Sequence, residues 1–337
     1  MPRMRKNGPT IGDVAALAEV SRATVSRVMN GSTTVDPGIA ERVRSAAASL
    51  NYRPSNLARS LSLGRTGTVA VSVPDLRNPM LHAVLQGVTE AAERDGYHLL
   101  VSIAGEDIAA EEAHFLDARQ RCDGLILINP RGPQEQLRAV LQQAAPAVVV
   151  NRETSTLPAP CLSIDHQYGL TLLIEHLVSL GHRHLAYVAG PQGAVSDPPR
   201  RRAVSAALDT HPQLRIDIVD GGRDVFDGRR AAESAVSTGA TGVLVFNDLV
   251  AVGLLARLHE LGVDVPGEVS VTGFDDIDLS HCSFPALTTV GVPHHDLGRA
   301  AWAEMAALLR EPGVDRRTVR SFRPQLVLRE STEQVPA

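Results

Sequence analysis

The sequence predicts a small all-α head with a helix-turn-helix, followed by an α/β body of two subdomains, each with a doubly wound parallel sheet. Three observations support this fold class. Residues 1–65 hold ten basic and four acidic residues, a net +6, whereas the whole chain carries −5, which leaves −11 for the rest. Helix-spaced apolar residues fill the head, and from Val69 onward β-branched runs alternate with helix-length stretches. A basic head on an acidic body indicates that the head binds a polyanion.

The composition is that of an ordinary globular protein of two or three domains, because 44% of the 337 residues are hydrophobic and 21% are charged. No apolar run approaches the roughly 20 residues that span a bilayer. The N-terminal sequence MPRMRKNGPT lacks the apolar core of a signal peptide. We therefore expect a cytoplasmic protein that does not bind a membrane.

Several enzyme classes are excluded because Lys6 is the only lysine. A Walker A loop, a pyridoxal-phosphate enzyme and a protein kinase each need a lysine in the active site. Cysteines at 122, 161 and 282 show no CxxC spacing, and the histidines at 182, 184, 294 and 295 lack a third metal ligand. We predict no catalytic residue, no metal and no cofactor, and we expect these histidines at the surface or in loops.

The first two helices of the head are indicated by their capping residues. Thr10 is followed three positions later by Asp13, the pattern of a capping box, and apolar residues at helical spacing come next. Ser21 can cap a second helix that runs through Asn30, with Gly31 as its terminator. Two helices joined by about three residues form a helix-turn-helix.

The second helix has an apolar and a polar face. Val25, Val28 and Met29 face inward, and the opposite face consists of Arg22, Ala23, Ser26, Arg27 and Asn30. In the major groove of DNA an arginine can bind guanine through two hydrogen bonds, and an alanine can contact the thymine methyl group. Helix pairs of this shape also occur in proteins that bind no DNA. The geometry alone therefore leaves DNA binding open.

A third helix is expected after Asp36, which caps it, with Pro37 in its first turn. The segment Pro54–Leu61 is too short to be a stable helix by itself. Its apolar end beside arginines suits a segment that folds only on DNA, where Leu61 would enter the minor groove between base pairs. Residues 64–67 then read as a flexible link.

Five motifs follow one another through the head: Asp13-Val14-Ala15, Val20-Ser21, Thr24-Val25-Ser26-Arg27-Val28, Asn30-Gly31 and Leu50-Asn51-Tyr52-Arg53-Pro54. Their order resembles the N-terminal signature of the LacI/GalR family of bacterial transcription regulators. The resemblance implies base-reading positions, phosphate-binding or supporting positions, and a hinge helix in the minor groove. The DNA-binding residues that we predict are Thr10, Ser21, Arg22, Ala23, Thr24, Ser26, Arg27, Asn30, Tyr52, Ser55, Asn56, Ala58 and Leu61.

Strands and helices are expected to alternate through the body. Strands are predicted at 69–73, 99–102, 125–128, 148–150, 185–189, 215–219, 243–246 and 269–273. Helices between them include 80–94, 111–121, 170–180 and 250–261. Regular alternation implies parallel sheets, which bind ligands at the carboxyl ends of their strands. The body is too long for one sheet, so we expect two similar subdomains with a cleft between them.

The resemblance continues through landmarks that include Val73-Pro74-Asp75, Cys122-Asp123-Gly124, Asn247-Asp248 and Gly273-Phe274-Asp275-Asp276. The effector domain of the family is similar to periplasmic sugar-binding proteins, and a small ligand closes or opens its cleft. The resemblance implies a helix-turn-helix domain at 1–52, a hinge helix and linker at 53–66, and an effector-binding and dimerisation domain at 67–337. Within that domain the expected N-subdomain covers about 67–166 and 297–325, and the C-subdomain about 167–296 and 326–337.

Carried over residue by residue, the resemblance also implies an effector site. Its members are Asp75, Asn78, Met80, Arg200, Arg223, Asn247 and Asp275. Sugar hydroxyls need planar groups that form two hydrogen bonds, and Asp, Asn and Arg at strand ends supply them. Arg200 is expected before a helix that ends at Ala207-Leu208. Alone, Asn247 and Asp275 could equally be a helix cap and a turn.

The effector site departs from the family pattern at two places. Ala203-Val204 stand where the family usually has glycine and an aromatic residue after its ligand arginine. An aromatic residue that stacks on the effector in several members is replaced by Arg223, unless Phe226 takes its place through a shifted loop. Two arginines that face the cleft would favour an anionic effector, such as a phosphosugar or a sugar acid, whereas a solvated Arg223 would not.

Two functions remain open from the sequence. The leading hypothesis is a DNA-binding repressor whose operator affinity is set by a small ligand, a carbohydrate or phosphosugar. Two copies would read a pseudo-palindromic operator. We expect a homodimer and not a tetramer, because residues 329–337 contain no leucine heptads. The alternative is a cytoplasmic sugar-binding or sugar-processing α/β protein whose helical head does not bind DNA. Arg22, Arg27 and the Pro54–Leu61 segment favour the repressor, since a sugar-binding protein has no use for them.

Overall fold

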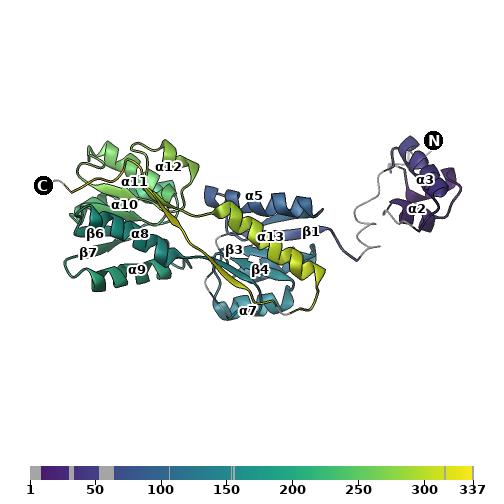
Figure 1. Ribbon diagram of the computed structural model, residues 1–337, viewed down its shortest axis with the longest axis horizontal. Helices are drawn as coiled ribbons and strands as arrows, with labels where there is room; N and C mark the ends of the chain where they lie inside the picture. The colour runs from purple at the N-terminus through teal and green to yellow at the C-terminus, as the bar shows by residue number, and fades with distance from the viewer. Residues whose placement is uncertain are drawn as a thin grey trace, which may run out of the picture. The chain divides into compact units, whose positions relative to one another are not determined.

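The computed structural model describes residues 9–29, 34–52, 64–105, 107–152, 154, 156–314 and 316–335 (Figure 1). The chain divides into two compact units, the head at residues 1–67 and the body at residues 68–337. Among the described residues no helix is both long enough and apolar enough to cross a membrane.

The head is a three-helix unit: α1 (Ile11–Leu17), α2 (Arg22–Met29) and α3 (Pro37–Ser49). The predicted capping box is confirmed, because the Thr10 side chain accepts from the Asp13 amide and the Asp13 side chain accepts from the Thr10 amide. Asp36 caps α3 as expected, accepting from the amides of residues 38 and 39. The helices enclose a core of Val14, Ala15, Ala18, Val25, Val28, Ala40, Val43, Ala46 and Ala47.

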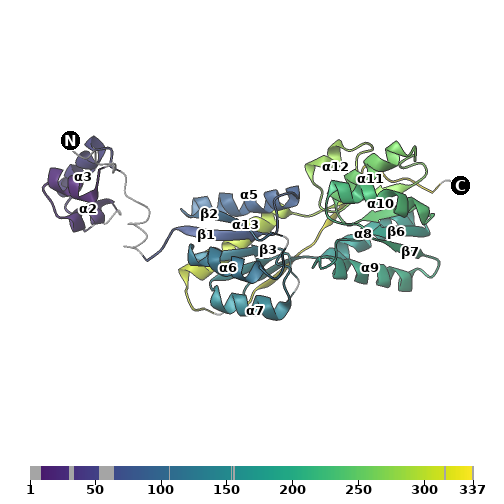
Figure 2. The same cartoon turned by 180° about the vertical axis from the view of Figure 1, so that it is seen from behind.

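The first half of the body, called the N-subdomain here, is built on a six-stranded parallel sheet in the order β11-β5-β4-β3-β1-β2. Its strands are β1 (Thr68–Val73), β2 (His98–Ile103), β3 (Gly124–Ile128), β4 (Ala147–Val150), β5 (Cys161–Ile164) and β11 (Val319–Phe322). Its helices are α5 (Pro79–Arg94), α6 (Glu111–Gln120), α7 (Gln134–Gln143) and α13 (His294–Arg310). Helices cover both faces, with α13 in front of the sheet in Figure 1 and α6 in front in Figure 2.

The second half, the C-subdomain, has a four-stranded parallel sheet in the order β7-β6-β8-β9. Its strands are β6 (His184–Val188), β7 (Arg215–Val219), β8 (Gly242–Val245) and β9 (Ser270–Thr272). Its helices are α8 (His166–Ser179), α9 (Asp197–Thr210), α10 (Val225–Ser237), α11 (Asp248–Glu260) and α12 (Asp278–Cys282). Alternate strand residues point to opposite faces, so a separate apolar cluster forms on each side of the sheet.

Two helix pairs approach so closely that only glycine fits. A Cβ atom on Gly87 of α5 would lie 2.1 Å from the His295 carbonyl oxygen of α13. On Gly228 of α10 it would lie 1.9 Å from the Val250 carbonyl oxygen of α11. Because the obstacle is backbone in each case, neither helix pair can separate slightly without losing its contact. Each subdomain therefore holds one tightly locked helix pair.

The chain passes between the two subdomains three times. It crosses between β5 and α8, between β10 (Thr289–Gly291) and α13, and between β11 and β12 (Gln325–Val327). β10 and β12 pair as an antiparallel ribbon. His166 opens α8 after the first crossing, and His294 opens α13 after the second. These crossings form the hinge of the body.

Candidate functional site

The polar face of α2 is exposed on the head. Arg22, Ala23 and Arg27 are exposed, whereas Val25 and Val28 on the opposite face are buried. The exposed Ser21 precedes the helix, and its hydroxyl oxygen accepts from the Thr24 amide at 3.1 Å. A helix held by a core on one side therefore presents two arginines and one alanine to solvent on the other.

The remaining predicted DNA-binding residues differ in their surroundings. Thr24 and Ser26 are half-buried, and the Thr10 hydroxyl donates to the Asp13 carboxylate at 2.8 Å. Tyr52 is half-buried and packs against the core of the head. Five predicted residues lie outside the described residues: Asn30, Ser55, Asn56, Ala58 and Leu61. The same holds for the predicted hinge segment.

The body contains a cavity of about 200 Å³ between its two subdomains, at the carboxyl ends of three strands from each sheet. The segments that follow β1, β2 and β3 form one wall, and the segments that follow β6, β7 and β8 form the other. Its polar lining consists of Asp75, Arg77, Asn78, Asn129, Arg131, Gln192, Ser196, Arg223, Asp224 and Asn247. Parallel sheets present ligand sites at this edge.

Four of the seven predicted effector residues line the cavity, namely Asp75, Asn78, Arg223 and Asn247. Met80 does not, because its side chain is buried in the apolar core of the N-subdomain. Arg200 lies inside α9 and not before a helix, so that expectation was wrong: α9 begins at Asp197 and tolerates Pro198 and Pro199 in its first turn.

The lining side chains also hold the backbone in place. Asn78 caps α5, accepting from the Met80 amide at 2.9 Å. Asn247 caps α11 through the Val250 amide at 2.9 Å, and its side-chain amide donates to the Arg223 carbonyl at 3.1 Å. Asn78 and Asn247 therefore each cap a helix and line the cavity.

Two contacts connect the subdomains across the cavity. The guanidinium of Arg77, in the loop after β1, lies 3.7 Å from the carboxylate of Asp224, which follows β7. The Asn78 side chain hydrogen-bonds to the Asp275 carboxylate, whose residue follows β9. Both contacts join the two walls of the cavity.

Arg200 and Asp275 are buried behind the cavity. The Arg200 guanidinium lies between two rings, 4.5 Å from the centroid of Phe246 and 4.1 Å from that of Phe274. Burial lowers the pKa of Arg200, and the neighbouring Tyr187 and Asp275 act against this shift. Burial also raises the pKa of Asp275 to about 7, although Arg200 and Asn78 favour its ionised form.

Arg223 and Phe226 were the two candidates for the place that an aromatic residue occupies in the family. Arg223 lines the cavity, whereas Phe226 is 71% exposed and lies outside the lining. An aromatic ring is nevertheless present, because Phe246 lines the cavity directly after β8. Sequence reasoning missed this residue, although its position between a strand and Asn247 was a usable signal.

Arg131 and Asn129 were also missed. The Arg131 guanidinium donates to the Gly105 carbonyl and lies 3.6 Å from the Glu111 carboxylate. Glu111 is buried and accepts from the amides of residues 131 and 132. The loop after β3 is therefore fixed from behind by a helix of the N-subdomain.

The expectation of histidines at the surface or in loops was wrong for His294, which is 6% exposed and begins α13. His182 lies in the loop between α8 and β6 as expected, but it is buried there, and both side chains form hydrogen bonds inside the body. Within the described residues there is no group of three or more His, Cys, Asp or Glu side chains that could hold a metal ion.

Comparison with known proteins finds similarity over both units. A family described as bacterial regulatory proteins, lacI family, matches residues 10–55, and a periplasmic-binding-protein-like domain matches 174–332. The HTH-type transcriptional regulator GalR of Salmonella typhimurium strain SL1344 is 33% identical over 328 residues, covering 96% of this chain and 95% of that protein. The Lac repressor dimer bound to operator and the anti-inducer ONPF matches with a TM-score of 0.86 at 28% identity, covering 97% and 100% of the two chains. The complex of the regulator CelR with cellobiose matches with a TM-score of 0.70 at 26% identity, covering 96% and 99%.

Proposed function

This chain belongs to the LacI family of bacterial transcription regulators, and on that premise we propose that it is a repressor whose operator affinity is set by a sugar in the cavity of the body. It is a DNA-binding regulator and not an enzyme. The observation that carries the proposal is the presence, in one chain, of an exposed arginine-bearing helix face and a polar cavity between two subdomains. A sugar-processing protein with an unrelated head would not need an exposed helix face that bears arginines.

On DNA, Arg22 and Arg27 would each bind a guanine edge in the major groove, and Ala23 would contact a thymine methyl group. Ser21, Thr24 and Ser26 would contact phosphates. Leu61 and Ala58 would lie in the minor groove, in a hinge segment that folds when two copies meet. We propose the same domain boundaries as from the sequence: the DNA-binding domain ends at 52 and the hinge and linker at 66, and the subdomains of the body change at about 166, 297 and 325.

The effector is proposed to be a single sugar ring or a derivative of one. A cavity of about 200 Å³ is below the usual 300–1,000 Å³ of ligand pockets, which favours a monosaccharide over a disaccharide. Phe246 offers an apolar ring for the face of a sugar, and the amides of Asn129 and Asn247 lie in the same wall. Asp75, Asn78, Arg223 and Asp275 remain proposed contacts, and Met80 would act only through packing.

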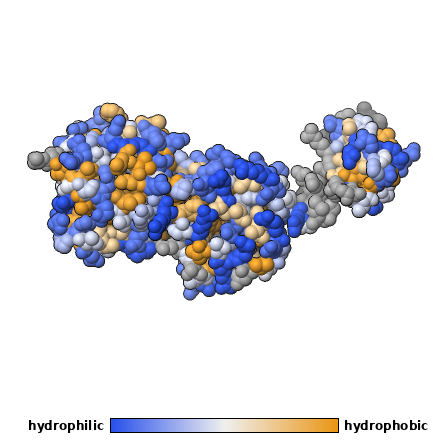
Figure 3. Space-filling model, viewed as in Figure 1, coloured by the Kyte–Doolittle hydropathy of each residue, from blue (hydrophilic) through white to orange (hydrophobic). Residues whose placement is uncertain are grey.

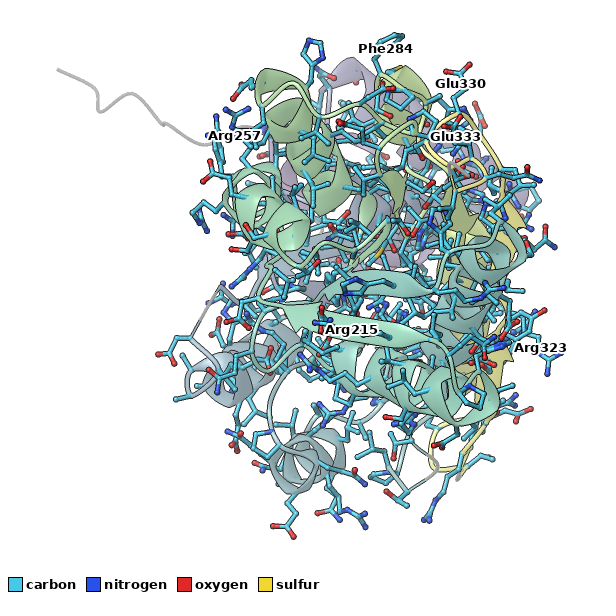
Figure 4. The ribbon with its side chains drawn as sticks, turned by 90° about the vertical axis from the view of Figure 1, so that its left-hand side faces the viewer. Arg215, Arg257, Phe284, Arg323, Glu330 and Glu333 are labelled. Carbon is cyan, nitrogen blue, oxygen red and sulfur yellow. The ribbon has the colours of Figure 1, made fainter. Side chains whose placement is uncertain are left out.

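A homodimer in the cytoplasm is the proposed working form. Two large apolar side chains of the C-subdomain are unusually exposed, Phe226 at 71% and Phe284 at 87%. Phe284 projects outward from the loop after α12 (Figure 4). Apolar patches are visible on the half of the body that holds α8–α12 (Figure 3). Exposed apolar groups of this kind mark protein interfaces, and a two-fold interface would match a palindromic operator.

Coupling would follow from closure of the cleft. A ligand that bridges Asp275 on one wall and Asp75 or Asn78 on the other would favour one arrangement of the subdomains. In a dimer this arrangement would set the separation of the two chains at Gly67, and hence whether paired hinge segments form.

Fluorescence anisotropy on the DNA upstream of the chain's own gene tests the function. We expect specific binding in competition with random DNA, and a change in affinity when one sugar of a panel is added. Equal affinity for random and upstream DNA at every sugar concentration would contradict the proposal.

A further inference from the structure

The loop that follows β9, residues 273–277, has an unusual backbone and is called the β9 loop here. Asp275 has a φ of +115° and Asp276 a φ of +59°, in the left-handed region that residues with side chains rarely adopt. Residues persist in such a conformation only where the surrounding structure holds them. The β9 loop therefore depends on its contacts with the rest of the body.

Asp248 supplies contacts on both sides of these two strained positions. It is the first residue of α11 and is fully buried. Its amide donates to the Phe274 carbonyl oxygen at 2.9 Å. Its carboxyl group accepts from the Ile277 amide at 3.0 Å. One residue therefore holds the β9 loop before Asp275 and after Asp276.

The same carboxyl group is connected to β10. The Thr289 hydroxyl, at the start of β10, donates to the second carboxyl oxygen of Asp248 at 2.6 Å. Gly273 permits this close approach, because a Cβ atom on it would lie 2.1 Å from that oxygen. β10 precedes the crossing that leads to α13. Asp248 therefore joins α11, the β9 loop and the strand next to the hinge.

The β9 loop brings Asp275 into contact with the opposite subdomain. The Asn78 side chain, on the other wall of the cavity, hydrogen-bonds to the Asp275 carboxyl group. His294 Nε2, at the start of α13, donates to the Asp275 carbonyl oxygen at 3.2 Å. A shift of the loop would therefore move Asp275 relative to the other wall.

We propose that Asp248 is a positioning residue for the effector response, which holds the β9 loop so that Asp275 meets Asn78 across the cavity. This inference rests on the proposed function and adds a residue that does not itself bind the effector. Asp248 is absent from the described residues that line the cavity, and both its carboxyl oxygens already accept hydrogen bonds inside the body. Its influence on a ligand would therefore pass through Asp275.

Two variants at this position separate the hydrogen bonds from the charge. Asp248→Ala removes both acceptors and should release the loop. Asp248→Asn keeps an acceptor for the Ile277 amide and places a donor beside the Thr289 hydroxyl, whose oxygen can accept. Burial raises the pKa of Asp248 well above its usual value, and the neighbouring Asp275 and Asp276 add to the shift. A neutral amide should therefore replace the carboxyl group, whereas alanine should not.

Hydrogen exchange of the full chain without ligand is the first measurement, and it requires no knowledge of the effector. Peptides that cover residues 273–277 should exchange at least about tenfold faster in Asp248→Ala, because the Ile277 amide has lost its acceptor. In Asp248→Asn they should exchange like the parent. Parental exchange in the alanine variant would overturn the inference and leave the sugar-controlled repressor intact.

Calorimetry with D-galactose, D-glucose and D-ribose as probes is the second measurement. The sugar that binds the parent should bind Asp248→Ala at least about tenfold more weakly, and Asp248→Asn within about threefold of the parent. Leu258→Ala is the matched control, because Leu258 lies near the other end of α11 in an apolar cluster of the C-subdomain. It should lower the Tm without changing sugar affinity. An equal loss of affinity in this control would mean that lower stability explains the effect, and the inference would be wrong.

A cooperative thermal transition of the body shows that each variant is folded. If Asp248→Ala is not, Thr289→Val replaces it, because it keeps the side-chain shape and withdraws one hydrogen bond from Asp248. Faster exchange of the loop and about threefold weaker sugar binding are then expected. Faster exchange with parental sugar affinity would contradict the positioning role. If none of the three sugars binds the parent, that result counts against the proposed function, and the exchange measurement alone decides the inference.

Discussion

The head and the cleft use their polar side chains in opposite ways. On α2 of the head, Arg22 and Arg27 are exposed and form no hydrogen bond or ion pair with another described residue. In the cleft, Asn78 and Asn247 cap helices, and Asp275 is buried beside Arg200. The comparison teaches that recognition in the head is separable from folding, whereas recognition in the cleft is part of the fold.

The strongest way to break this comparison is Arg27→Ala. The variant should lose specific operator binding, because each half-site loses a base contact that contributes about 1–3 kcal/mol. Its Tm and its sugar affinity should stay at the parental values. Footprinting on operator DNA and calorimetry measure the two quantities. A parental footprint, or a clear fall in Tm, would contradict the separation.

Asp275→Ala tests the cleft half of the comparison. The variant should still bind operator but lose its response to sugar, and it should also unfold at a lower temperature. Removal of the carboxyl group takes away one of the three groups, with Tyr187 and Asp197, that favour the charged form of the buried Arg200, and it leaves buried polar atoms unpaired, which costs about 1–3 kcal/mol. The Tm should therefore fall by roughly 5 °C or more. A variant with parental Tm would show that the cleft is as separable as the head.

The pH dependence of stability sharpens the same point. An unfolded aspartate ionises near its usual value of 3.8, whereas the folded pKa of Asp275 is raised to about 7. Between these values the folded state holds the extra proton, so the free energy of unfolding falls as pH rises from about 4 to 7. Asp275→Asn should flatten this slope in urea titrations at several pH values. An equal slope in parent and variant would argue against a buried, protonated Asp275.

The smallest expected effect is that of Thr10→Ala. Loss of the α1 cap should destabilise the head by about 1 kcal/mol, since the hydroxyl no longer accepts from the Asp13 amide. The body should unfold at its parental temperature. Hydrogen exchange resolves the two units in one experiment. Faster exchange in the body would mean that the units do not unfold separately.

Much of the fold was predictable because its signals are local. Each of the eight predicted strands ends within one residue of an observed strand. Four strands were missed: β5 has only four residues, β11 is an arginine-bearing edge strand, and β10 and β12 have three residues each. Their positions depend on the long-range pairing of β11 with β5 and of β12 with β10.

The cleft was predictable only in part. Asp75, Asn78 and Asn247 follow strands and carry suitable groups, so pattern and resemblance indicated them. The places of His166 and His294 depend on three chain crossings that bring together residues far apart in sequence. An isolated histidine gives no periodic signal, so nothing local distinguishes these buried rings from the exposed His281.

Strand β1 has a mechanical consequence. It runs without interruption from Thr68, next to the end of the head unit, to Val73, next to the cavity residue Asp75, a length of about 20 Å. Parallel neighbours β2 and β3 clamp it on both edges, so a pull along it would load two hydrogen-bonded ladders in shear. The strand is a stiff rod with the cavity at one end and the exit toward the DNA-binding unit at the other. A tilt of β1 at its cavity end would therefore be transmitted to Thr68. Flexible residues inserted at Gly67 would prevent its transmission to the head.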